Sequence, residues 1–193
     1  MVPICTTDSS GAAAGTMGRM TRRLFIFDGP ERFVPGTIGE PGGRSFFLQA
    51  RKGGALVSVG LEKAQVAALA SRLEDLLDAV EAPTDAVPDE HPLEEPVIEL
   101  FRVGAMALAW DPETEAVVIE AQTPTEDGDY LELPDEADEG PDLLRVRIGA
   151  ADARAFVRRA EALVAGGRPA CPFCGQPLEP SGHFCPSANG HLN

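Results

Sequence analysis

Three of the four cysteines and two of the three histidines of this chain lie within its last 23 residues. Cys171 and Cys174 belong to a CPFCG turn, in which proline and glycine let backbone amides point at the sulfur atoms while two thiolates converge on one ion. Cys185 follows in the sequence GHFCP and supplies a third thiolate. Because zinc takes four ligands at the corners of a tetrahedron, these cysteines predict a small Zn²⁺ site completed by one imidazole.

Two histidines compete for the fourth position of this site. His183 is separated from Cys185 by a single residue, a tight spacing that the backbone freedom of Gly182 relieves. His191 has a more usual separation from Cys185, but it lies close to a chain end, where chains tend to fray. The spacing therefore leaves both histidines open. With either one, protein ligands fill all four positions, which predicts a structural zinc in a ribbon formed by residues 168–193.

Charge and composition limit the classes of molecule that this chain is expected to bind. The chain carries 31 acidic residues against 16 Lys and Arg, a formal net charge of −15. This disfavours nucleic-acid binding, because affinity for phosphate backbones comes from clustered basic side chains. Residues 1–21 are rich in Ser, Gly and Ala and lack the apolar core of a signal peptide, so we expect a flexible tail, no membrane partner and a cytoplasmic location. A reducing compartment also suits thiolate ligands, and Cys5 has no predicted role in that tail.

Two proline-punctuated acidic segments interrupt the predicted core. Residues 81–96 are interpreted as a linker, and residues 125–142 as a solvated loop, because neither segment has enough apolar surface to bury. The second segment has an alternative interpretation, as a docking surface for a basic partner. Such a partner would be a protein, since the rest of the sequence disfavours nucleic acid and membrane.

Residues 22–167 are predicted to form an α+β core, mainly an antiparallel sheet of about seven strands with two helices. The strands are expected in short apolar or alternating runs at residues 24–27, 32–38, 44–51, 55–59, 97–110, 116–123 and 143–148. The run 97–110 is interpreted as one long strand bulged at Gly104. Apolar residues recur at helical spacing from Val66 to Val80 and from Phe156 to Val164, which predicts two core-facing helices.

The order of strands followed by a helix occurs twice. Val57-Ser-Val-Gly60 precedes the first predicted helix, and Val146-Arg-Ile-Gly149 precedes the second. This similarity suggests two related halves within one domain. Strand-to-helix turns that converged independently would look the same, so the pattern alone does not establish a repeat.

Two further clusters of polar residues are candidate sites. Asp28, Glu31 and Arg32 share a DGPER turn, which would orient a small ligand or perform acid-base chemistry, or would simply be a turn. Arg154 and Arg158 lie four residues apart on the second predicted helix. They would contact an anionic ligand, a partner or the acidic loop, or else form a solvated helix face.

Several strings of this sequence resemble an uncharacterised bacterial family, domain of unknown function 3090. They span residues 24–34, 44–51 and 57–63, together with the CPFCG and GHFCP motifs and Asn189-Gly190. The resemblance covers nearly everything after Thr21. It implies a cytoplasmic protein of high-GC bacteria and adds no reaction. Members of the family often have an aromatic residue in place of His191, which implies His183 as the fourth zinc ligand.

The sequence contains no phosphate-binding loop, dinucleotide fingerprint or zinc-protease motif. The sequence therefore does not decide whether the protein is an enzyme, although the absence of these motifs favours a protein without enzymatic activity. We expect a zinc-binding adaptor or regulatory module that acts through protein contacts, and a homo-oligomer is compatible with this. The alternative is an enzyme or binder of a small metabolite that uses Asp28, Glu31 and Arg32.

Overall fold

The computed structural model describes residues 21–40, 42–166, 171, 173–174 and 185 of the chain. In chain order its elements are β1 (Leu24–Asp28), β2 (Arg32–Ile38), β3 (Ser45–Lys52), β4 (Ala55–Leu61), α1 (Lys63–Ala79), β5 (Glu99–Arg102), β6 (Ala105–Asp111), β7 (Ala116–Gln122), β8 (Leu143–Gly149) and α2 (Ala150–Ala165). The predicted α+β class and the two helices are confirmed. No helix in the described part of the chain is both long enough and apolar enough to cross a bilayer.

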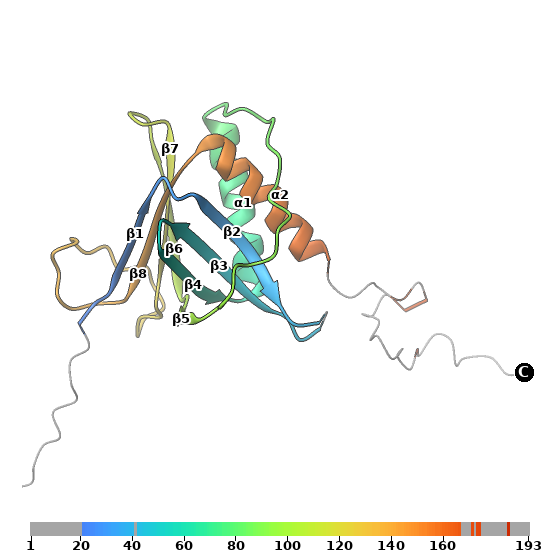
Figure 1. Cartoon of the computed structure of the whole chain (residues 1–193), viewed down its shortest axis with the longest axis horizontal. Helices are drawn as coiled ribbons and strands as arrows, with labels where there is room; N and C mark the ends of the chain where they lie inside the picture. Colours follow the sequence, from blue (N-terminus) through green and yellow to red (C-terminus); the bar gives the residue numbers. More distant parts are fainter. Residues whose placement is uncertain (1–20, 41, 167–170, 172, 175–184, 186–193) are drawn as a thin grey trace, which may run out of the picture.

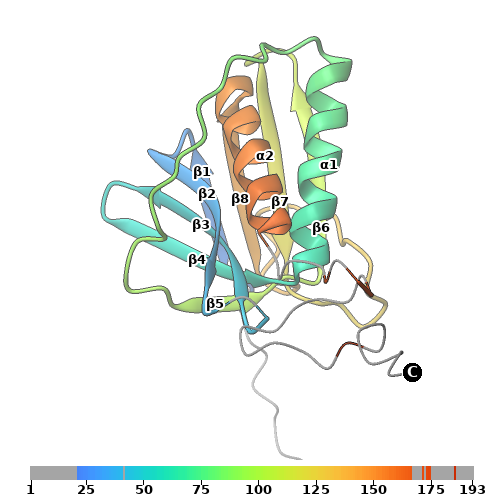
Figure 2. The same cartoon turned by 90° about the vertical axis from the view of Figure 1, so that its right-hand side faces the viewer.

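The strands form two four-stranded sheets, which corrects the expectation of one mainly antiparallel sheet. One sheet has the order β1-β8-β7-β6 and the other β2-β3-β4-β5. Both are mixed, because β1 runs parallel to β8 and β5 runs parallel to β4. The two helices lie side by side against the sheets (Figures 1 and 2). Parallel neighbours come from distant parts of a chain, so periodicity along the sequence did not reveal them.

The run 97–110 is not one strand. It divides into β5 and β6, which belong to different sheets, and Gly104 marks the crossing. A Cβ atom at Gly104 would lie 2.4 Å from the Cα of Pro124, so only glycine fits without a shift of the main chain. The main-chain amide of Gly104 also donates to the carbonyl of Gln122 at 2.7 Å.

The two halves of the chain have the same arrangement. Strands β2, β3 and β4 form an antiparallel meander that leads into α1, and β6, β7 and β8 form another that leads into α2. Each half begins with a strand that joins the sheet of the other half, namely β1 and β5. The repeat suggested by the sequence is therefore present in the architecture, with the first strands exchanged.

One hydrophobic core unites both sheets and both helices, and corresponding residues of the two halves point into it. In α1 the seventh and eleventh residues are Leu69 and Leu73, and in α2 they are Phe156 and Ala160; all four are buried. The apolar stripe predicted for each helix thus faces the core, which explains why the helices pack against the sheets. The core members from the strands include Leu48, Val59, Val117, Ile119, Val146 and Ile148.

Candidate functional site

The three cysteines predicted to bind metal come together. The sulfur atoms of Cys171, Cys174 and Cys185 all lie within 4.8 Å of one another, and those of Cys171 and Cys185 are 3.8 Å apart. Ligand atoms about 2.3 Å from a tetrahedral ion lie about 3.8 Å from each other. The three sulfurs are therefore close enough to hold one metal ion between them.

The environment of Cys171 favours its thiolate. Burial opposes ionisation, but hydrogen bonds from the backbone amides of Cys174 and Phe173 and from the neighbouring thiols outweigh it and lower the pKa of Cys171. Backbone amides directed at sulfur are the contacts expected of a CPxCG turn. His183 and His191, the two candidates for a fourth ligand, lie outside the described residues, as does most of the predicted ribbon.

The DGPER turn does not bring its polar groups together. Asp28 is exposed and lies 3.8 Å from Arg147, while Glu31 pairs with Arg51 at 2.7 Å. Arg32 extends in another direction, where its guanidinium grips Asp89 with Nε–Oδ2 and Nη2–Oδ1 distances of 2.6 and 3.2 Å. Asp28 thus pairs apart from the other two. Glu31 and Arg32 are linked indirectly, because Arg51 and Arg32 both pair with Glu94, at 2.9 and 3.7 Å.

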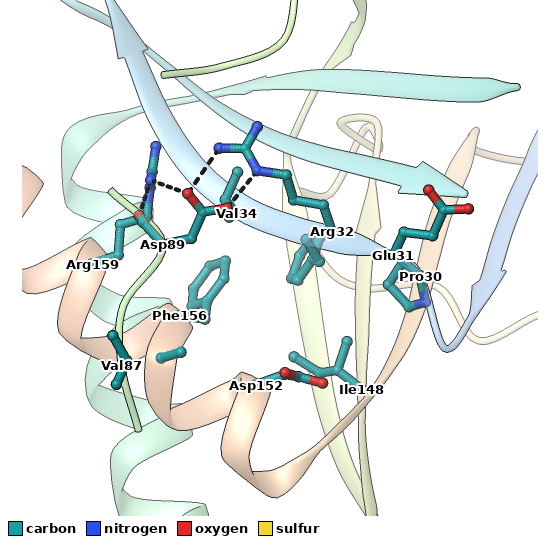
Figure 3. Close-up of a pocket in the computed structure, with 12 residues that line it drawn as sticks. Pro30, Glu31, Arg32, Val34, Val87, Asp89, Ile148, Asp152, Phe156 and Arg159 are labelled. Atoms are coloured by element: carbon teal, nitrogen blue, oxygen red, sulfur yellow. Dashed lines mark hydrogen bonds and ion pairs between the residues drawn. The ribbon is translucent and has the colours of Figure 1, made fainter. Parts of the chain in front are cut away.

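A cavity of about 200 Å³ does lie beside this turn, between β2, α2 and the acidic segment 81–96 (Figure 3). Phe156 and Ile148 contribute apolar walls. Figure 3 shows Arg32 and Arg159 both directed at Asp89, with Asp152 on the other side of the cavity. Hydrogen bonding to Arg32 lowers the pKa of Asp89, so the carboxylate that holds the two guanidinium groups is ionised.

The acidic segment 81–96, called the strap below, is held by the core in a way that the sequence did not indicate. Arg159 donates to the carbonyls of Pro35 in β2 and of His91 in the strap, at 2.6 and 2.8 Å. Buried Gln49 pairs with the main chain of Glu94, giving a bond to its carbonyl at 2.9 Å and accepting from its amide at 2.7 Å. These side chains satisfy the strap's backbone. The strap also buries Leu93 against Val34 and Phe47.

The backbone of segment 125–142 is likewise held by hydrogen bonds from side chains outside the segment. Gln122, fully buried at the end of β7, donates to the carbonyl of Leu131 at 2.7 Å and accepts from its amide at 3.0 Å. Arg22 adds bonds to the carbonyls of Pro134 and Pro141 at 2.8 and 3.1 Å. The solvated-loop interpretation was therefore incomplete, because the loop's acidic side chains are largely exposed while parts of its backbone are bound. Gln122, a glutamine within an apolar strand, was the feature of the sequence that could have indicated this anchoring, and its role was not predicted.

The two predicted arginines of α2 both contact other elements, although Arg158 is exposed. Arg154 is only 7% exposed and pairs with Asp78 of α1 at 2.5 Å. Arg158 donates to the carbonyls of Ala86, at 2.5 Å, and of Thr84, both in the strap. An acidic segment does dock on this helix, but it is the strap and not the loop 125–142.

Comparison with known proteins identifies one relationship. A family model described as "Protein of unknown function (DUF3090)" matches residues 25–185. This confirms the resemblance seen in the strands and in the cysteine motifs. No curated protein and no solved structure was found to match the chain.

Proposed function

The chain belongs to the DUF3090 family, and from its own geometry we propose that it is a cytoplasmic zinc-binding protein that acts through protein contacts. The observation that carries the proposal is the convergence of three cysteine sulfurs within 4.8 Å. Sulfur ligands at tetrahedral separation suit zinc, and the CPFCG turn supplies the amide donors that stabilise metal-bound thiolates.

The zinc is proposed to be structural. Three thiolates and one imidazole, from His183 or His191, complete a closed tetrahedron that leaves no position for a reacting water. The metal would then stabilise the fold of the short cysteine-containing segment, which is too small to bury a core of its own. A cytoplasmic setting keeps these thiols reduced and available to the ion.

Protein contact is the proposed role because an apolar side chain stands beside the metal knuckle. Phe173, between the first two cysteines, is 74% exposed. An exposed aromatic ring beside the cysteine ligands resembles the anchor residues of protein interfaces. Catalysis at Asp28, Glu31 and Arg32 has less support, since each of these residues is engaged in an ion pair with a different partner.

Elemental analysis tests the metal. Protein purified without added metal should contain about one zinc per chain, and Cys171→Ser should lose most of it. His183→Ala should reduce zinc retention more than His191→Ala, and the reverse order would assign the fourth ligand to His191. A zinc content near zero in the wild type, with the three thiols reacting freely, would refute the metal site.

The contact role needs a separate experiment. Phe173→Ala should weaken capture of specific partners from the native host while leaving zinc content unchanged. Ile98→Ala is a matched control, because Ile98 is also an exposed apolar side chain, at 60%. Identical partners for wild type, Phe173→Ala and Ile98→Ala would contradict the contact role but not the zinc site.

A further inference from the structure

The fold contains two equivalent grooves, and only one is covered. In the first, α2 packs along edge strand β2, and the strap runs over it. In the second, α1 packs along edge strand β6 and leaves an open groove of about 630 Å³. Its lining includes Leu69, Arg72, Asp75 and Leu76 of α1 and Met106 and Leu108 of β6. Figure 2 shows α1 and β6 together at one side of the molecule.

Corresponding residues line the two grooves. Leu69 and Phe156 are both the seventh residue of their helix, and Arg72 and Arg159 are both the tenth. In the covered groove, Arg159 bonds the strap and Pro35 of β2. In the open groove, Arg72 is exposed and has no hydrogen bond or ion pair with any described residue.

Edge strand β6 lacks the features that usually protect an edge. Its first six residues, Ala105–Trp110, carry no charge and no proline, and within the described chain its main chain makes ladder bonds only to β7. Strand β2, by contrast, contains Pro35 and contacts the strap through Arg32 and Val34. Uncharged, uncovered edges are sites where another strand adds to a sheet.

The groove beside β6 carries one positive and one negative side chain, so two copies of this face could pair opposite charges. Arg72 and Asp75 lie three residues apart on the exposed face of α1 that borders the groove, and Asp75 has no partner among the described residues either. Two copies of this face related by a two-fold axis would set Arg72 of each against Asp75 of the other. An isologous interface requires this kind of self-complementarity. An acidic peptide would gain little here, because the negative charge of Asp75 offsets the positive charge of Arg72.

We infer that the β6 and α1 face is a homodimer interface in which β6 pairs antiparallel with β6 of a second copy, centred on Leu108. The two four-stranded sheets that contain β6 become one eight-stranded sheet across the dimer. The α1 helices lie side by side over the junction, with two reciprocal Arg72–Asp75 ion pairs. The second copy covers the groove that the strap covers in the other half. The proposal stands independently of the zinc site.

Sedimentation velocity of the full chain between about 1 and 100 μM tests the interface. The wild type should show a concentration-dependent dimer. Arg72→Glu and Asp75→Arg should each weaken dimerisation about ten-fold or more, because each places two like-charged pairs across the axis. The double variant carrying both changes should recover dimerisation, since the reciprocal pairs are restored with their signs exchanged.

Strand pairing has its own test. Ala109→Glu adds a charge to the exposed side of β6 and should abolish the dimer. Ile38→Glu adds the same charge to β2, at a residue that is 46% exposed, and should leave dimerisation unchanged. Circular dichroism confirms that each variant is folded. A wild type that is monomeric throughout, a double variant that fails to recover, or equal effects of Ala109→Glu and Ile38→Glu would overturn the proposal.

Discussion

Arg159 and Arg72 occupy the same position in the two helices, yet of the two only Arg159 is buried and bonded to other described residues. Arg159 is 9% exposed and reaches from α2 to the carbonyl of Pro35 and to the strap. Arg72 faces an open groove. In this architecture of two similar halves, one arginine thus binds the chain's own strap, and the corresponding arginine of the other half is exposed.

Replacement of Arg159 should destabilise the fold. Arg159→Met keeps the length of the side chain but removes the donors that Arg159 directs at Pro35, Asp89 and His91. The buried carbonyl of Pro35 then loses this partner, and Asp89 keeps only Arg32 of its two guanidinium partners. We expect a loss of about 2 to 4 kcal/mol in the free energy of unfolding, measured by urea denaturation. Lys63→Met, at an exposed position of α1, should change it by no more than about 0.5 kcal/mol. Equal effects of the two substitutions would mean that Arg159 does not hold the strap.

The strap should make stability depend on pH in the acidic range. Hydrogen bonding to Arg32 lowers the pKa of Asp89 in the folded protein, so the folded state binds this proton less readily than the unfolded chain. The contribution of Asp89 is therefore fully present above pH of about 4 and is lost as pH falls through its lowered pKa. Asp89→Asn should cost about 1 to 3 kcal/mol at neutral pH and progressively less below pH of about 4.

Urea unfolding of Asp89→Asn and the wild type across this range measures the difference directly. Glu90→Gln controls for the loss of one negative charge, because Glu90 is the adjacent, exposed residue of the strap. A difference between Asp89→Asn and the wild type that stays constant down to pH of about 2 would contradict the role of the Asp89 carboxylate.

Gly104 should tolerate no side chain. Gly104→Ala places a Cβ 2.4 Å from the Cα of Pro124, and because the clash involves main chain it is not relieved by a rotamer change. We expect a cost of about 1 to 3 kcal/mol or more, seen as a lower midpoint of thermal or urea unfolding. Gly54→Ala is the matched control, since a Cβ there meets nothing within 4 Å. Similar midpoints for the two variants would show that the crossing between the sheets has room to adjust.

Removal of metal should leave the core folded. The hydrophobic core runs from Phe27 to Ala160 and includes none of the three cysteines. We therefore expect a chelator to release zinc and expose the thiols while the far-ultraviolet circular dichroism signal of the helices and sheets persists. The three cysteines can be followed by thiol titration in the same samples. Collapse of the whole signal on chelation would show that the cysteine segment is an integral part of the core.

The sequence by itself determined the features that depend on neighbours along the chain. The CPFCG turn and Cys185 predicted the cysteine cluster, because ligand spacing in a knuckle is a local property. The stripes from Val66 to Val80 and from Phe156 to Val164 predicted both helices, because a helix repeats its buried face every three to four residues.

Only the tertiary structure decided which distant segments meet. The exchange of β1 and β5 between sheets, and the crossing at Gly104, depend on contacts between residues far apart in sequence, so an apolar run such as 97–110 looked like one strand. The strap was misjudged for the same reason. Its own composition favours disorder, but the fold brings donors on other elements to its backbone, namely Gln49, Arg32, Arg158 and Arg159. The fold also buries Leu93 of the strap against Val34 and Phe47.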